Sequence, residues 1–225
     1  MEGDPIRYTV PGADGYRTTT TWPPLESKLT AFALRADGML STDEGVSGAR
    51  VYRYLPQDSG QPSHLSPSTI PATLTWETSP MTQPFDFAGN IELKLDASIT
   101  ALDTGFIVAI HDVAENGVSE PITVGWLRAS LSIVDEPQST PGAPSLRCRE
   151  PRIIPIGKSV SYRIAITPNA HRIAAGHRLR LVLGSSDEDH KDLEVLGFTH
   201  TPVRQASLTT VFSSSRLLLP VLPRG

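Results

Sequence analysis

The feature that most constrains the fold of this chain is an alternation of apolar and polar residues with a period of two. In NIELKLDASI (90–99) the side chains of Ile91, Leu93 and Leu95 alternate with polar ones, and SVSYRIAI (159–166) and HRLRLVLG (177–184) repeat the pattern. Such alternation is typical of strands buried on one face. GFIVAIHDV (105–113) is apolar at both parities, which indicates a central strand covered on both faces.

Helical periodicity is weak throughout the chain, and turn-forming residues divide it into about ten short strands. The best candidate helix is the short segment DEDHKDLEVLG (187–197), while 20 prolines and 17 glycines are spread over 225 residues. This pattern predicts an all-β fold, an antiparallel β-sandwich or jelly roll. Further strands are expected at 29–34, 50–55, 72–78, 122–134, 206–212 and 216–222.

The first 25 residues predict a connector that precedes a single sandwich domain at 26–225. RYTVPGADGYRTTTTWPP (7–24) combines a short strand from Arg7 to Val10, a Gly-rich turn and a Trp before two prolines. Docking against another domain is the simplest role for Trp22, and Tyr16 and Pro23 are further candidates for interdomain contact. The polar, proline-rich stretches 56–71 and 135–151 are predicted to be surface excursions.

Charge and cysteine content restrict the partners and the compartment. The net charge of −4 gives the chain no overall attraction to nucleic acid or to an anionic membrane. No apolar run approaches the length of a membrane span, and the first residues lack the features of a signal peptide. Cys148 is the single cysteine, which excludes an internal disulfide. We therefore expect a cytoplasmic location, unless a signal peptide lies on a preceding region.

No segment has the spacing of a catalytic serine. The closest approach to Gly-x-Ser-x-Gly is EGVSGA around Ser47, which lacks the second glycine and a following helix. Ser185 and Ser186 lie near Asp187 along the chain, but closeness in sequence does not define the geometry of a triad. We therefore predict no catalytic residue in this chain.

Metal and cofactor sites are not predicted either. His190 lies in an acidic run at 187–192 that lacks the alternating acids and the turn glycine of a calcium loop, so a solvated loop is the better interpretation. His171 and His177 do not have zinc-ligand spacing. Exposed aromatic residues leave sugar binding open as an alternative, although Trp76 and Trp126 lie inside expected strands, where packing in the core is the default.

Seven runs in order resemble one protein family. They are YTVPGADGYRTTTTWPP (8–24), LTAFALRADGML (29–40), the long stretch 74–117, GWLRAS (125–130), STPGAP (139–144), AGHRLRLVLGSSD (175–187) and SSSRLLLPVLP (213–223). Together they are similar to the segment that follows the catalytic domain in the cocaine esterase and X-prolyl dipeptidyl peptidase (CocE/NonD) family of serine hydrolases. The resemblance extends from about Arg7 to Pro223.

This resemblance implies a non-catalytic C-terminal domain with a fold similar to galactose-binding jelly rolls. In the family, the Ser-Asp-His triad lies in an upstream α/β-hydrolase domain, so the implied partner is such a catalytic domain or subunit, and no cofactor is implied. One departure concerns the family's D-T-D-F motif, which here is Asp103-Thr104-Gly105-Phe106, without the second acid. A second is the segment after the strand at 50–55, which is compressed to about Gln57 to Ala72.

The motif residues also have structural interpretations. GWLR resembles a bulged strand with Trp126 in the core and Arg128 available for an ion pair, for which Asp112 is a candidate partner; Gly176 is expected to supply a positive φ before a strand. His111, Asp112, Trp126 and Arg128 are also the candidates for a ligand site.

Three functions therefore remain open at this stage. The first is an accessory domain that stabilises or completes a hydrolase or mediates oligomer contacts. The second is an independent module that binds a carbohydrate or another small ligand, and the third is a repurposed stand-alone enzyme of this fold with polar residues inside the sandwich.

Overall fold

Thirteen β-strands and two short 3₁₀ helices make up the part of the chain that this computed structural model describes, residues 6–56, 69–187 and 200–223. The strands are β1 (Ile6–Tyr8), β2 (Arg17–Thr19), β3 (Lys28–Leu34), β4 (Leu40–Ser41), β5 (Ala49–Tyr54), β6 (Leu74–Glu77), β7 (Phe85–Ile99), β8 (Gly105–Val113), β9 (Ser119–Arg128), β10 (Val160–Ile173), β11 (Arg178–Gly184), β12 (Ser207–Phe212) and β13 (Arg216–Val221). The 3₁₀ helices are η1 (Ala129–Leu131) and η2 (Glu136–Gln138).

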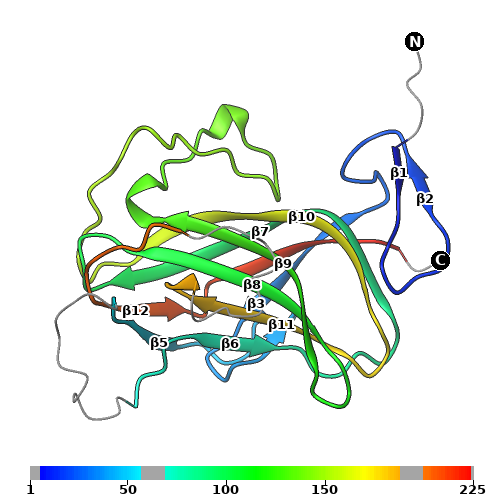
Figure 1. Cartoon of the computed structure of the whole chain (residues 1–225), viewed down its shortest axis with the longest axis horizontal. Coiled ribbons are helices and arrows are strands. Elements are labelled where there is room, and N and C mark those ends of the chain that lie inside the picture. Colours follow the sequence, from blue (N-terminus) through cyan, green and yellow to red (C-terminus); the bar gives the residue numbers. More distant parts are fainter. Residues whose placement is uncertain (1–5, 57–68, 188–199, 224–225) are drawn as a thin grey trace.

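Eleven of these strands form one antiparallel sheet that wraps into a sandwich, which confirms the all-β prediction. The order is β4-β3-β13-β7-β10-β9-β8-β11-β6, and β12 pairs with both β5 and β7. The long strands β7 and β10 run across the whole body (Figure 1). Within the described ranges, no helix is long and apolar enough to cross a membrane.

Because of the period-two pattern, every second side chain of a strand points into a common interior. The largest fully buried side chains include Trp76, Tyr52, Tyr162, Phe87 and Phe106, contributed by five different strands. Every residue of β8 after the first is buried, which confirms the expected strand covered on both faces. Because burial of apolar surface scales with area, this interior is the main source of stability.

Several predicted segments differ in extent from the structure; β7 and β10, for example, are longer than the patterns at 90–99 and 159–166. The strand expected at 122–134 ends at Arg128 and continues into η1, and the strand expected from Arg7 to Val10 covers Ile6–Tyr8. Of the predicted helix at 187–197, all residues after Asp187 lie outside the described residues, as does most of the predicted excursion at 56–71.

The N-terminal segment forms a separate two-stranded sheet, β1–β2, at one end of the sandwich (Figure 1). Val10 belongs to a second apolar cluster with Ala88, Ala170 and Leu222, which come from the main body. Asp86 on β7 binds Arg17 of β2 at 2.7 Å. The segment is therefore fixed to the sandwich by both apolar and ionic contacts.

Candidate functional site

A cavity of about 510 Å³ lies where β8 begins and where β5, β9 and β11 end. Its described lining is mostly apolar and aromatic, with a few charged and hydroxyl groups among them. The lining residues are Tyr54, Leu55, Pro56, Gly105, Phe106, Ile107, Trp126, Leu127, Arg128, Ser185, Ser186, Asp187, His200, Thr201, Pro202, Val203 and Arg204. An apolar cavity of this size with a few polar groups has the character of a small-molecule site.

Trp126 lines this cavity rather than the core, so its predicted core position is wrong. Its cross-strand partner on β8 is Ile107, and its side chain is 42% exposed. Alternation along β9 then places Arg128 on the same face. The alternation of a strand separates its two faces but does not say which one is the core, and β8 buries large side chains on both.

Arg128 pairs with Asp103 and not with Asp112, which corrects the second expectation for this motif. The Arg128 Nε donates to Asp103 Oδ2 at 2.7 Å. The same carboxylate accepts hydrogen bonds from the backbone N–H of Thr104 and from both the backbone N–H and the hydroxyl of Ser130. Asp103 therefore fixes one edge of the guanidinium and ties the β7–β8 turn to η1.

Opposite Arg128, the cavity wall contains a second carboxylate that is already hydrogen-bonded. Asp187 accepts from the backbone N–H of His200 at 2.6 Å and lies 2.6 Å from the Nδ1 of the same residue. The His200 ring lies against Trp126, with 4.8 Å between the ring centroids. Behind it, the buried Ser185 hydroxyl lies 3.0 Å from the Tyr52 hydroxyl and 3.3 Å from that of Thr104.

His111 and Asp112 do not join Trp126 and Arg128 in this cavity. Asp112 lies at the far end of β8, where its two oxygens contact His171 Nε2 at 3.0 Å and His177 Nδ1 at 2.8 Å. His111 is buried, and its Nδ1 lies 3.2 Å from the Ser119 hydroxyl. The four ligand candidates from the sequence are thus divided between two places. Gly176 has the expected positive φ, 82°, and places His177 beside Asp112.

The three connector candidates all belong to the N-terminal segment, and each has a different partner. Trp22 contacts Tyr8 edge to face with 5.5 Å between the ring centroids, and Tyr16 lies under the Arg7 guanidinium at 4.9 Å. Pro23 packs against Gly89 of β7, where an added Cβ would come within 2.7 Å of the Pro23 Cβ. Tyr16 and Trp22 remain exposed, by 61% and 38%.

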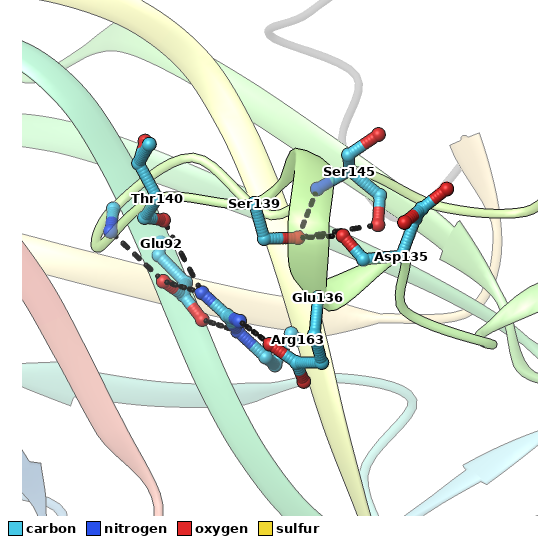
Figure 2. A network of polar contacts seen from close by, with 8 residues as sticks. Glu92, Asp135, Glu136, Ser139, Thr140, Ser145 and Arg163 are labelled. Carbon is cyan, nitrogen blue, oxygen red and sulfur yellow. Dashed lines mark hydrogen bonds and ion pairs between the residues drawn. The ribbon is translucent and has the colours of Figure 1, made fainter.

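A buried carboxylate that the sequence did not single out fastens the 135–151 excursion (Figure 2). Glu92 alternates with apolar residues and was expected to face solvent, yet its side chain is fully buried. It accepts from Arg163 Nε at 2.5 Å and from the backbone N–H of Gly142 at 3.0 Å. Arg163 also donates to Glu136 and to the Thr140 carbonyl. Hydrogen bonding to Glu92 raises the pKa of the Arg163 guanidinium.

Within the described residues, no group of three His, Cys, Asp or Glu side chains is arranged to hold a metal ion. The hydroxyl of Ser185 is buried among hydroxyl partners, and Cys148 is exposed. The polar contacts instead join separate motifs of the sequence: Asp103 with Arg128, Asp112 with His177, and Glu92 with Gly142.

Residues 3–207 match the family model described as the X-Pro dipeptidyl-peptidase C-terminal non-catalytic domain. The chain belongs to this family. The resemblance stated from the sequence motifs is thereby confirmed, and the jelly-roll domain described above is a non-catalytic domain of the kind that CocE/NonD family hydrolases carry at their C-terminal part.

Relatives of this X-Pro dipeptidyl-peptidase C-terminal domain are much longer than the chain. The cocaine esterase of Rhodococcus sp. (strain MB1 Bresler) is 25% identical over 211 residues, which cover 81% of this chain and 34% of the esterase. The chain thus spans about a third of the length of the curated relatives it matches, 34% and 33% for two of them.

Two solved structures have the same fold. A CocE/NonD family hydrolase from Staphylococcus aureus superposes with a TM-score of 0.75 at 16% identity, covering 97% of this chain and 40% of that one. An aminopeptidase from a marine sediment archaeon, Thaumarchaeota archaeon, gives a TM-score of 0.68 at 17% identity, covering 95% of this chain and 40% of its own.

Proposed function

We propose that this domain stabilises or completes an α/β-hydrolase catalytic domain of the cocaine esterase class, and that it docks through its N-terminal face. This face consists of Ile6, Tyr16, Trp22 and Leu25. All four side chains are exposed, Leu25 by 78%. Exposed apolar residues concentrated in one segment are typical of a protein–protein contact.

The observation that carries the proposal is that these exposed residues sit on a firmly held support. The β1–β2 sheet is anchored by the Arg17–Asp86 ion pair and by the apolar cluster around Val10. A docking surface held in one conformation loses less entropy on binding than a flexible one. The threefold greater length of the relatives supports the same role, because their remaining part has room for a catalytic domain.

Co-expression with a catalytic polypeptide tests this role. The chain is produced together with each α/β-hydrolase of the cocaine esterase class encoded in the same genome, and the complex is measured by size-exclusion chromatography and by hydrolysis of p-nitrophenyl acetate. We expect a stable complex whose esterase activity survives heating longer than that of the hydrolase by itself. Failure of every pair to associate contradicts the proposal.

A matched pair of variants locates the contact. Y16S/W22S removes two aromatic anchors of the N-terminal face, and we expect it to weaken the complex at least tenfold. L102S/V118S removes two other exposed apolar side chains, 63% and 54% exposed, at the turns after β7 and β8. This control is expected to leave the complex unchanged. Equal effects of the two pairs contradict docking through the N-terminal face.

A further inference from the structure

The cavity beside Trp126 combines apolar side chains with two arginines, Arg128 and Arg204. Phe106 and Leu127, both buried, belong to the core-facing side, while Ile107 and Trp126 pair across β8 and β9. Its volume of about 510 Å³ is within the range of about 300–1,000 Å³ that accommodates small organic ligands. The apolar part of a ligand would therefore lie against these strands.

The guanidinium of Arg128 is oriented before any ligand arrives. Asp103 holds its Nε at 2.7 Å, and the hydrogen bonds of Asp103 with Thr104 and Ser130 occupy the rest of that carboxylate. The terminal nitrogens of Arg128 have no hydrogen-bond partner among the described residues. A fixed guanidinium with unused N–H groups is well suited to a carboxylate, which it binds in a forked geometry.

A second cation lines the same cavity. Arg204 is exposed and forms no ion pair with any residue that the structure describes. The only acidic residue among the described lining is Asp187, whose two oxygens are both engaged by His200. The lining therefore contains two arginines and one carboxylate, and the carboxylate that pairs with Arg128, Asp103, lies outside the lining.

Gly105 has no side chain and therefore leaves space in the cavity beside Arg128. It lies directly opposite Arg128 in the β8–β9 pair, so a side chain there would project on the same face. An added Cβ would have only the Ser185 carbonyl oxygen within 4 Å, at 3.7 Å. The position accepts a side chain sterically, and its absence leaves the cavity open beside Arg128.

We propose that this cavity binds a small organic anion, a carboxylate attached to a planar apolar group, with Arg128 and Arg204 on the carboxylate and Trp126 beside the apolar part. An aromatic ring next to a guanidinium favours flat ligands with a charged end over neutral ones. The site belongs to the domain itself and does not depend on docking to a hydrolase.

Matched ligands test the charge requirement on the isolated chain. N-acetylphenylalanine has both a carboxylate and a planar apolar ring. Its carboxamide lacks only the charge, and methyl galactoside represents a sugar ligand. Binding is measured by isothermal titration and by thermal unfolding. We expect N-acetylphenylalanine to raise the Tm by about 3 to 6 °C at ten times its Kd, from the mass-action relation for a chain of this size. The carboxamide is expected to bind at least tenfold more weakly.

Isosteric variants at one position test the location. G105D places a carboxylate beside Arg128, and we expect it to weaken the binding of N-acetylphenylalanine at least tenfold. G105N has the same shape without the charge and is expected to change the affinity by no more than about threefold. R204Q, on an exposed residue whose loss does not threaten folding, is expected to weaken binding about tenfold, as for the loss of one charge-assisted contact.

The contact between Trp126 and the apolar part of the ligand is tested separately. W126L is expected to lower the preference for N-acetylphenylalanine over N-acetylleucine while both remain dependent on Arg204. The proposal is overturned if the acid does not bind, if the acid and the carboxamide bind equally, if only the galactoside binds, or if G105D and G105N behave alike. None of these results bears on complex formation with a hydrolase, so the accessory role is judged separately.

Discussion

Glu92 shows at the level of one residue how a long excursion is held on this sheet. Its carboxylate lies on the face of β7 opposite to Ile91 and Leu93 and is fully buried, so an unpaired charge there would be costly. Arg163 and the Gly142 N–H provide its partners. An added Cβ on Gly142 would lie 3.1 Å from the Asn90 carbonyl oxygen, and its φ is 81°. The close approach of this turn therefore requires glycine.

Replacing this carboxylate is expected to be costly. E92A leaves Arg163 without its buried partner and removes the acceptor of Gly142, so we expect the free energy of unfolding to fall by about 2 to 3 kcal/mol. K94A, on an exposed residue of the same strand, is expected to change it by less than about 0.5 kcal/mol. Urea unfolding followed by fluorescence measures both. A similar small loss for the two variants would show that Glu92 contributes nothing specific.

Gly89 lets the N-terminal segment approach β7 closely. An added Cβ would lie 2.7 Å from the Pro23 Cβ and 3.2 Å from that of Pro220, and its φ is 136°. G89A is expected to destabilise by about 1 to 3 kcal/mol more than G15A, because overpacking adds to backbone strain. Gly15 has a φ of 74° and open space around it, so it reports the strain without the clash. Equal unfolding midpoints in urea for the two variants would contradict this packing.

Among the elements, the β1–β2 sheet depends most on a single ionic group. Asp86 accepts from Arg172 at 2.7 and 2.9 Å and from Arg17 at 2.7 Å. It therefore joins β7 to β10 and to β2. Hydrogen bonding from Arg172, with the charges of both arginines, holds the pKa of the Asp86 carboxyl below its ordinary value of 3.8.

A lowered pKa in the folded state gives a definite pH dependence. The stabilisation from Asp86 is complete above the unfolded pKa of about 3.9 and is lost as the pH falls through the lower folded pKa. D86N is thus expected to be less stable than the natural chain at pH 7 and to approach it in stability near pH 2. D14N, which alters an exposed acid of the same segment, is the control. The free energy of unfolding in urea is measured for each chain from pH 7 to pH 2. If the difference between D86N and the natural chain stays constant with pH, the stability does not depend on the titration of Asp86.

The strands were largely predictable and the site was not. Alternation identified β7, β10 and β11 because each has a face in the common interior, and β8 was identified by its apolar residues at both parities. It could not assign the faces of β9, so Trp126 was placed in the core. The cavity brings together Arg128, Asp187 and His200, and Asp103 supports it from behind. The position of the cavity depends on which strands become neighbours in the sheet, and local sequence patterns do not predict strand order.

At the scale of the whole molecule, the buried apolar side chains that the structure describes form two clusters of very different size. The main cluster extends through the sandwich, whereas the second joins the N-terminal segment to it through a few small residues such as Val10 and Ala88. Parts with few buried contacts open locally at a lower free energy than the core. The sequence predicts a boundary near residue 25 between the connector and the sandwich. Because the two parts differ in packing, the free energy at which each one opens tests this boundary.

Hydrogen exchange measured by mass spectrometry is expected to show that residues 6–19 open at a lower free energy than residues 105–113. The reason is that β1 and β2 pair only with each other, whereas β8 lies between β9 and β11. R17Q removes the ionic contact with Asp86 from the N-terminal side, so it should speed exchange in 6–19 and leave 105–113 unchanged. If both segments exchange at the same free energy in the natural chain, the N-terminal sheet unfolds with the sandwich, and the two parts are a single cooperative unit.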